Sequence, residues 1–178
     1  RGPLGRGMQR QATEVCTLAL YPEEGEQEAA IVLSAGAGIR GLSLIYPEQS
    51  LDVSTLKKYP WTIRGNGAGC WTVDLVLLNS YNGIDMASAQ CDNAVLRGIW
   101  SSTFYDMIKV GGGSDGVVME HVAGSYGPWL ESGRARARGI TDEQKQVTSQ
   151  WFKDSARYFV FEDCSNVKTW GLAGFHSA

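Results

Sequence analysis

Short runs of alternating or continuous apolar residues recur along this chain, and their length suits a β-strand better than a helix. Four runs resemble one another and lie at residues 38–45, 71–78, 94–100 and 117–123. A shorter run follows each of the last three, at residues 81–86, 105–110 and 126–131. The pattern predicts pairs of short strands that repeat along the sequence.

The spacing of these runs predicts how they pack. Leu75 precedes Ile99 by 24 positions, Ile84 precedes Ile108 by 24, and Ile99 precedes Val122 by 23. Short strands at this period bury an apolar face only by stacking coil on coil. The leucine-rich repeat pattern is absent, and a propeller blade needs a longer repeat. We therefore expect an all-β right-handed parallel β-helix, with Leu75, Ile99 and Val122 stacked in its core.

Glycine-rich links and two insertions complete the expected coils. Residues 65–69 and 111–116 are rich in glycine, which adopts the positive φ of tight corners. The insertion at 46–60 is polar and reads as a loop, and a second insertion covers 134–156. Within the second, Thr141 and Gln144 form a capping-box pattern that predicts a short helix ending near residue 153. We expect one partial β-helix domain over residues 1–178, truncated at both ends.

Composition and charge narrow the class of protein. Hydrophobic residues make up 43% and charged residues 20%, which is typical of a folded domain. The net charge of −3 argues against a nucleic-acid partner, which would require a basic surface. No apolar run reaches the roughly 18 residues of a membrane span, so none is expected.

The four cysteines do not form a metal-binding pattern. Cys16, Cys70, Cys91 and Cys164 include no Cys-x-x-Cys pair, and the chain has two histidines. We therefore expect no metal and no cofactor, with calcium at the corner residues Asp92 and Asp115 as a minor alternative. Cys70 and Cys91 precede equivalent strands, so they should lie one coil apart, either as thiols or as a disulfide.

Several segments together resemble a known family. Residues 44–49, 59–65 and 78–85, and the pairs Glu120-His121 and Pro128-Trp129, resemble pectin-lyase-like parallel β-helix proteins, which include polygalacturonases and pectate lyases. The resemblance covers about residues 38–129. It implies a polysaccharide or oligosaccharide partner and a secreted or cell-surface location. The polygalacturonase motifs Asn-x-Asp, Asp-Asp, Gly-His-Gly and Arg-x-Lys do not occur in this chain, so no catalytic residue is carried over.

A column of charged residues is the candidate catalytic site. If Ile84, Ile108 and Leu130 stack inward, the residues after them stack outward. These are Asp85, Lys109 and Glu131. An acid, a base and an acid in one solvent-facing column could perform acid–base chemistry on a glycan, or could form a structural salt-bridge ladder. Both interpretations stay open at this stage.

Candidate substrate-binding residues surround that column. Trp129 and Tyr105 offer aromatic faces for sugar rings, as Trp100 could too. Arg134, with Arg136 and Arg138, could clamp a carboxylate, and His121 is a further candidate. The sequence thus indicates a carbohydrate-active β-helix, a polysaccharide lyase or a glycoside hydrolase. The alternatives are a non-catalytic glycan-binding or structural β-helix, like a tailspike or an adhesin, and a different solenoid.

Overall fold

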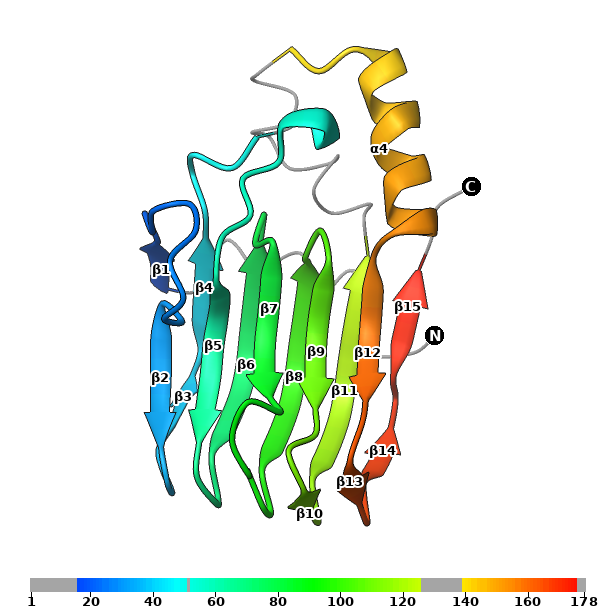
Figure 1. Cartoon of the computed structure of the whole chain (residues 1–178). Helices are drawn as coiled ribbons and strands as arrows, with labels where there is room; N and C mark the ends of the chain where they lie inside the picture. Colours follow the sequence, from blue (N-terminus) through cyan, green and yellow to red (C-terminus); the bar gives the residue numbers. More distant parts are fainter. Residues whose placement is uncertain (1–15, 51, 126–138, 176–178) are drawn as a thin grey trace.

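A computed structural model describes residues 16–50, 52–125 and 139–175. Within these residues every pair of neighbouring strands is parallel. An eight-stranded sheet and a five-stranded sheet face each other, and the chain passes from one to the other in each coil (Figure 1). This arrangement confirms the predicted mainly-β class and the stacked parallel coils of a β-solenoid.

The larger sheet has the order β1-β4-β6-β8-β11-β14, with β3 beside β6 and β15 beside β11. Its strands are β1 (Cys16–Ala19), β3 (Gly38–Arg40), β4 (Leu42–Ile45), β6 (Trp71–Leu78), β8 (Val95–Ser102), β11 (Val118–Ser125), β14 (Lys168–Trp170) and β15 (Ala173–Phe175).

The smaller sheet has the order β12-β9-β7-β5-β2. Its strands are β2 (Ile31–Ser34), β5 (Trp61–Asn66), β7 (Asn82–Met86), β9 (Asp106–Val110) and β12 (Arg157–Phe161). A two-stranded sheet of β10 (Ser114–Asp115) and β13 (Cys164–Ser165) lies at one corner.

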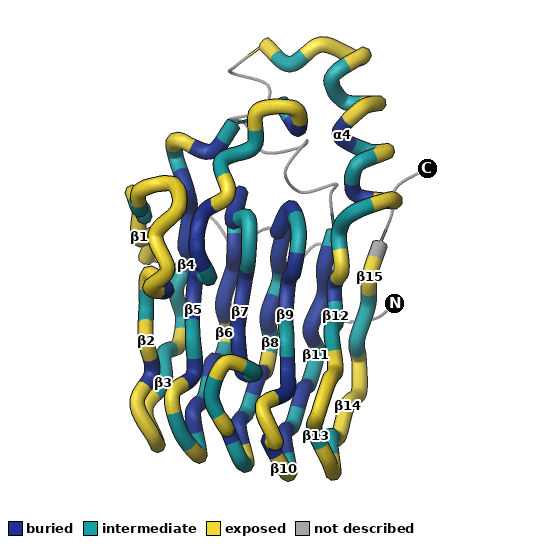
Figure 2. Tube along the Cα trace, viewed as in Figure 1, coloured by how far each residue is buried: buried dark blue, intermediate teal, exposed yellow. Residues whose placement is uncertain are grey.

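The register confirms the predicted core columns. Leu75 pairs with Ile99, and Ile99 pairs with Val122, and all three side chains are fully buried. Ile84 pairs with Ile108 in the smaller sheet, where both are buried as well. Burial is densest along the central strands and falls toward the outermost coils (Figure 2).

The described parts of both insertions, including a short 3-10 helix and one α-helix, lie at the same end of the coils (Figure 1). The 46–60 loop contains a short 3-10 helix, Val53–Thr55, and the second insertion contains the predicted helix, α4 (Asp142–Asp154). Thr141 Oγ1 accepts the Gln144 N–H at 3.2 Å, and Gln144 Oε1 accepts the Thr141 N–H at 3.0 Å, which confirms the capping box. Val53 and Phe152 meet at Phe104 in a second small core.

The buried cysteines Cys70 and Cys91 lie beside each other, as their place before equivalent strands predicts. All four cysteines are free thiols, and Cys70 and Cys91 are fully buried. Burial raises the pKa of the Cys91 thiol, and the neighbouring Cys70 thiol adds to the rise. The Cys70 thiol donates to the carbonyl oxygens of Gly67 at 3.1 Å and Leu33 at 3.3 Å. In this structure the pair packs as two thiols rather than as a disulfide.

Candidate functional site

The predicted column of charges exists only in part. Asp85 and Lys109 are register partners, as expected, but Asp85 is 1% exposed and does not face solvent. Its Oδ1 accepts the backbone N–H groups of Ala87 at 2.9 Å and Ser88 at 3.0 Å. Its Oδ2 accepts from Arg64 Nε at 3.3 Å. Oδ1 therefore holds the turn that follows β7, and Oδ2 links β7 to β5 through Arg64.

The third member of the column is not Glu131. The strand beside β9 is β12, which places Phe159 beside Ile108 and Val160 beside Lys109. These two residues take the places expected for Leu130 and Glu131. Lys109 instead forms an ion pair with Glu162, with Nζ and Oε1 2.5 Å apart. The ion pairs of the described residues thus join Asp85 to Arg64 and Lys109 to Glu162, and they do not join Asp85 to Lys109.

The structure describes some of the other predicted binding residues and leaves the rest outside the described ranges. Glu131, Trp129 and Arg134 lie outside the described residues, as do Arg136 and Arg138. Tyr105 stacks on Tyr81, with ring centroids 5.5 Å apart. The Arg157 guanidinium lies 5.0 Å from the Tyr105 centroid, and two of its nitrogens donate to Asp106 at 2.6 Å. Tyr105 is half-buried and contacts both Tyr81 and Arg157.

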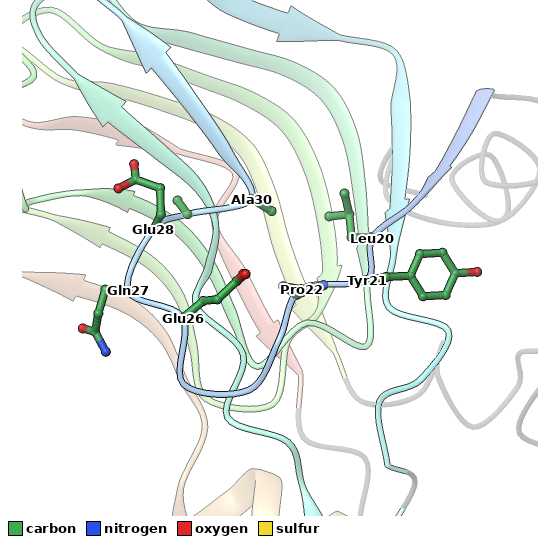
Figure 3. A pocket seen from close by; sticks show the side chains of 8 residues that line it. Leu20, Tyr21, Pro22, Glu26, Gln27, Glu28 and Ala30 are labelled. Carbon is green, nitrogen blue, oxygen red and sulfur yellow. The ribbon is translucent and has the colours of Figure 1, made fainter.

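A hollow near the start of the described chain has few groups that could bind a ligand or react with it. Residues 20–22 and 26–30, which connect β1 to β2, line it. Figure 3 shows the Tyr21 ring pointing away from the Glu26 and Glu28 side chains. The hollow is wide open, and its charged groups are glutamates without a basic partner among its lining residues. It does not bring together complementary groups around a ligand.

A row of left-handed residues crosses the larger sheet instead. One residue of each coil has a positive φ at the same place, between 52° and 71°. The row consists of Gly41, Asp74, Gly98, His121 and Gly171. Strand pairing skips this row, since Val73 pairs with Arg97 and the next pair is Leu75 with Ile99. The row is a stacked left-handed bend, with one residue from each strand, at which the inward–outward alternation of side chains shifts by one residue.

The glycines of this row make room for the two polar members. A Cβ at Gly98 would stand 2.8 Å from Asp74 Oδ1, and a Cβ at Gly171 would stand 2.8 Å from His121 Cδ2. The Asp74 carboxylate therefore leans over β8, and the His121 ring leans over the link from β14 to β15. Both side chains are about half exposed, at 48% and 44%.

Ion pairs flank the row on the same face. Arg40 Nε donates to Asp74 Oδ2 at 3.0 Å. Arg97 Nε lies 2.5 Å from Glu120 Oε2, and Glu120 Oε1 lies 3.5 Å from His121 Nδ1. Glu120 thus bridges a guanidinium and an imidazole. Its Oε2 is buried, and the contact with Arg97 does not have hydrogen-bond geometry.

Three tryptophans occupy outward positions on this face. Trp71, Trp100 and Trp170 alternate with inward positions of β6, β8 and β14 and remain partly exposed. Trp170 is 46% exposed and pairs with Glu120 in the register. The Trp71 ring lies over Gly38, where a Cβ would stand only 2.1 Å from Trp71 Cδ2.

Sequence reasoning named His121 and Trp100 on this face but missed the rest of it. Glu120 entered only through the family resemblance, and Asp74, Arg97, Trp71 and Trp170 were not named as candidates. One signal was available, because Gly41 and Gly98 are isolated glycines inside strand patterns, which often mark a tight bend.

Comparisons of the chain with protein-family models, curated proteins and solved structures find no match. Among the described residues, no helix is long and apolar enough to cross a membrane. The same residues contain no group of three or more His, Cys, Asp or Glu side chains placed to hold a metal ion. The corner residue Asp115 accepts from Ser165 and Asn166, and Asp92 accepts the Asp115 N–H at 2.9 Å.

Proposed function

We propose that this chain is a glycan-binding β-helix that holds a polysaccharide against the outer face of its larger sheet. The observation that carries the proposal is the set of three partly exposed tryptophans on that face, Trp71, Trp100 and Trp170. An indole ring presents a large apolar surface with one polar N–H, which suits a sugar ring that has an apolar face and a polar rim.

The ion pairs between the tryptophans supply the polar half of such a site. Arg40 with Asp74, and Arg97 with Glu120, place donors and acceptors beside the aromatic rings. Side chains already held in pairs lose little further freedom when they bind hydroxyl groups, so binding costs less entropy. The resemblance to pectin-lyase-like proteins supports the same ligand class, and a secreted or cell-surface location belongs to this proposal.

A polysaccharide lyase or glycoside hydrolase is the second candidate, and Glu120 favours it because its Oε2 is buried without a well-formed hydrogen bond. Asp74 is another carboxylate of this face, and it lies two strands away across β8. At about 4.8 Å per strand, the two lie roughly 10 Å apart. That is slightly beyond the ~6.5–9.5 Å of inverting glycosidases. Binding therefore has the stronger support.

A glycan panel tests the proposal. Neutral and acidic polysaccharides would be assayed by affinity electrophoresis, and reducing ends and unsaturated products would be scored separately. We expect at least one glycan to bind, and Trp170→Ala to weaken that binding about tenfold, which corresponds to ~1.4 kcal/mol.

Phe161→Ala is the matched control, because Phe161 is a similarly exposed aromatic residue on the smaller sheet, 44% exposed. Its loss should leave glycan binding unchanged. The proposal fails if no glycan binds, or if the Trp170 and Phe161 variants bind as tightly as the unaltered protein.

A further inference from the structure

The chain contains two Asn-Gly sequences, and the fold places them in different surroundings. Asn66 is the last residue of β5, and Gly67 follows it at a coil corner. Asn82 is the first residue of β7, and Gly83 lies inside that strand. Asparagine before glycine is chemically labile, because a glycine nitrogen without a neighbouring Cβ can reach the asparagine side chain and attack its amide carbon.

Asn66 has the accessibility that this reaction needs. It is exposed, and its register partner is Ser34 of β2, the outermost strand of the smaller sheet. On the other side of β5, the pairing with β7 ends before Asn66. Among the described residues, the Gly67 N–H donates to no backbone carbonyl. The end of the strand can therefore open at little cost, and neither reacting group is held by another partner.

Asn82 lacks that accessibility. Its Oδ1 accepts the Asp106 N–H at 3.4 Å, and its carbonyl oxygen accepts from Thr62 Oγ1 at 2.7 Å. Gly83 is buried, and a Cβ on it would collide with the Met107 carbonyl oxygen, so the backbones of β7 and β9 are in direct contact. The Asn82 side chain cannot turn toward the Gly83 nitrogen unless these central strands separate.

We propose that Asn66 is a site of spontaneous deamidation and isomerisation in the folded protein, and that the fold protects Asn82 from the same reaction. The product is isoaspartate or aspartate, and either one adds a negative charge at the coil corner. This modification is independent of any bound ligand.

The reaction needs water as its only co-reactant. A base in the solvent removes the proton from the Gly67 nitrogen, and this nitrogen forms a bond to Cγ of Asn66. The bond from Cγ to Nδ2 breaks, and Nδ2 takes up a proton and leaves as ammonia. Water then opens the five-membered succinimide ring. Cleavage of the new bond at Cγ gives aspartate, and cleavage of the original peptide bond gives isoaspartate.

Isoaspartate changes the corner because it lengthens the main chain by one carbon atom. Gly67 has φ of 127°, and a Cβ on it would stand 2.9 Å from the Ala35 Cβ, so the corner has no spare room. The Gly67 carbonyl oxygen also accepts the Cys70 thiol at 3.1 Å. The longer chain displaces this carbonyl and removes one acceptor of the buried thiol. The modified protein should therefore react faster with maleimide at Cys70.

The experiment incubates the folded, unaltered protein at mildly alkaline pH, where the glycine nitrogen loses its proton more readily. A short digestion in mild acid and fragment mass spectrometry then measure the loss of amide at Asn66 and Asn82 separately. We expect Asn66 to react at least about tenfold faster, since an opening of β7 that costs about 1.4 kcal/mol lowers the rate at Asn82 by that factor. In concentrated urea, the two Asn-Gly sequences should react at similar rates.

Asn66→Gln is the matched variant, because glutamine keeps the amide but must close a larger and less favourable ring. In the folded variant the loss of amide at position 66 should disappear, and the maleimide reaction of Cys70 should not rise with incubation time. An enzyme that methylates isoaspartate should label the incubated unaltered protein and not the variant.

Two results would overturn the site. One is a folded protein that keeps its amide at Asn66 under conditions in which the urea-unfolded chain loses it. The other is an equal or faster loss at Asn82 in the folded protein. If Asn66 is converted but Cys70 reacts no faster, the displacement of the Gly67 carbonyl is overturned and the site of modification stands.

Discussion

Asp74 and His121 occupy the same left-handed position on strands β6 and β11, one on each side of Gly98. Their φ angles are 54° and 52°, close to the 62° of the glycine between them. The left-handed row therefore continues unbroken through two residues that are not glycine. The left-handed backbone at these two positions turns two polar side chains to the outer face of the sheet. The 24-residue repeat of apolar residues does not predict this departure from a regular strand.

The left-handed backbone predicts an unusual order of stability at position 121. His121→Gly should be close to neutral, because relief of the left-handed strain offsets the added freedom of glycine in the unfolded chain. His121→Val should be less stable than His121→Gly by about 2 kcal/mol, since a β-branched residue tolerates positive φ poorly. Urea unfolding midpoints measure the difference. Equal midpoints for the two variants would contradict the strained geometry.

Two adjacent corner glycines separate backbone strain from crowding. Gly112 and Gly113 both have positive φ, at 62° and 78°. A Cβ at Gly112 would stand 2.4 Å from the Ala87 carbonyl oxygen, whereas a Cβ at Gly113 meets no atom within 4 Å. Gly113→Ala should cost about 1–2 kcal/mol from φ alone. Gly112→Ala should cost about 1–3 kcal/mol more, because a backbone atom must move. Denaturant unfolding of both variants tests this order, which fails if Gly113→Ala is the less stable one.

The core column makes a prediction about its central member. Ile99 lies between Leu75 and Val122 and is fully buried. Ile99→Ala should lower the free energy of unfolding by about 2–5 kcal/mol, through lost burial and the cavity left behind. Val118→Ala is the control, since Val118 is only partly buried on the outer side of β11, and it should cost much less. Similar losses for both variants would mean that Ile99 is not a core residue.

Acid should weaken the corner at Asp115. Hydrogen bonds from Ser165 and then Asn166 hold the pKa of Asp115 below its usual value in the folded protein. A carboxyl group with a lowered folded pKa stabilises the protein above its unfolded pKa, about 3.9, and loses that contribution as the pH falls through the folded pKa. Asp115→Asn should therefore be destabilising at neutral pH and should lose less stability on acidification.

Unfolding midpoints of the unaltered protein and Asp115→Asn at about pH 7 and about pH 2 provide the test. We expect the difference in unfolding midpoint between the two proteins to be smaller at the acidic pH. A larger difference in acid would contradict the lowered pKa of Asp115.

The rate at which each cysteine reacts with a thiol reagent should depend on how deeply that cysteine is buried. Cys16 is exposed, while Cys70 and Cys91 are fully buried. A maleimide should modify Cys16 in the native protein within minutes. Cys70 and Cys91 should react only when their coil opens, at a rate that rises with denaturant. Mass spectrometry of digests identifies the labelled sites. Rapid native labelling of Cys91 would contradict its burial, and a Cys70–Cys91 crosslinked peptide would show that the pair can be oxidised.

The periodic part of this fold was predictable from sequence because stacking demands it. Leu75, Ile99 and Val122 must repeat at one coil length to fill a continuous core, so their spacing identifies their register. The same reasoning failed at Leu130, where another apolar run imitates the next strand. The chain instead makes its second insertion first and returns with Phe159 beside Ile108. Periodicity does not reveal which of two similar runs pairs with β9.

The site was less predictable because it depends on departures from the pattern. Asp85 stands at an outward position, as alternation requires, yet the N–H groups of Ala87 and Ser88 and the Arg64 side chain close over it. His121 turns outward because its φ is positive, which no hydrophobic pattern encodes. Tertiary contacts decide both outcomes, and only the isolated glycines gave a local hint of the second.

The meeting of Val53 and Phe152 at Phe104 has a consequence for how the protein unfolds. Solenoid coils normally touch only their nearest neighbours, so they can fray one at a time from either end. Val53 belongs to the loop that follows β4, and Phe152 belongs to the helix that precedes β12. Their shared contact ties an early coil to a late one across the coils between them. Early and late coils should therefore unfold together, as one cooperative unit, rather than one after another.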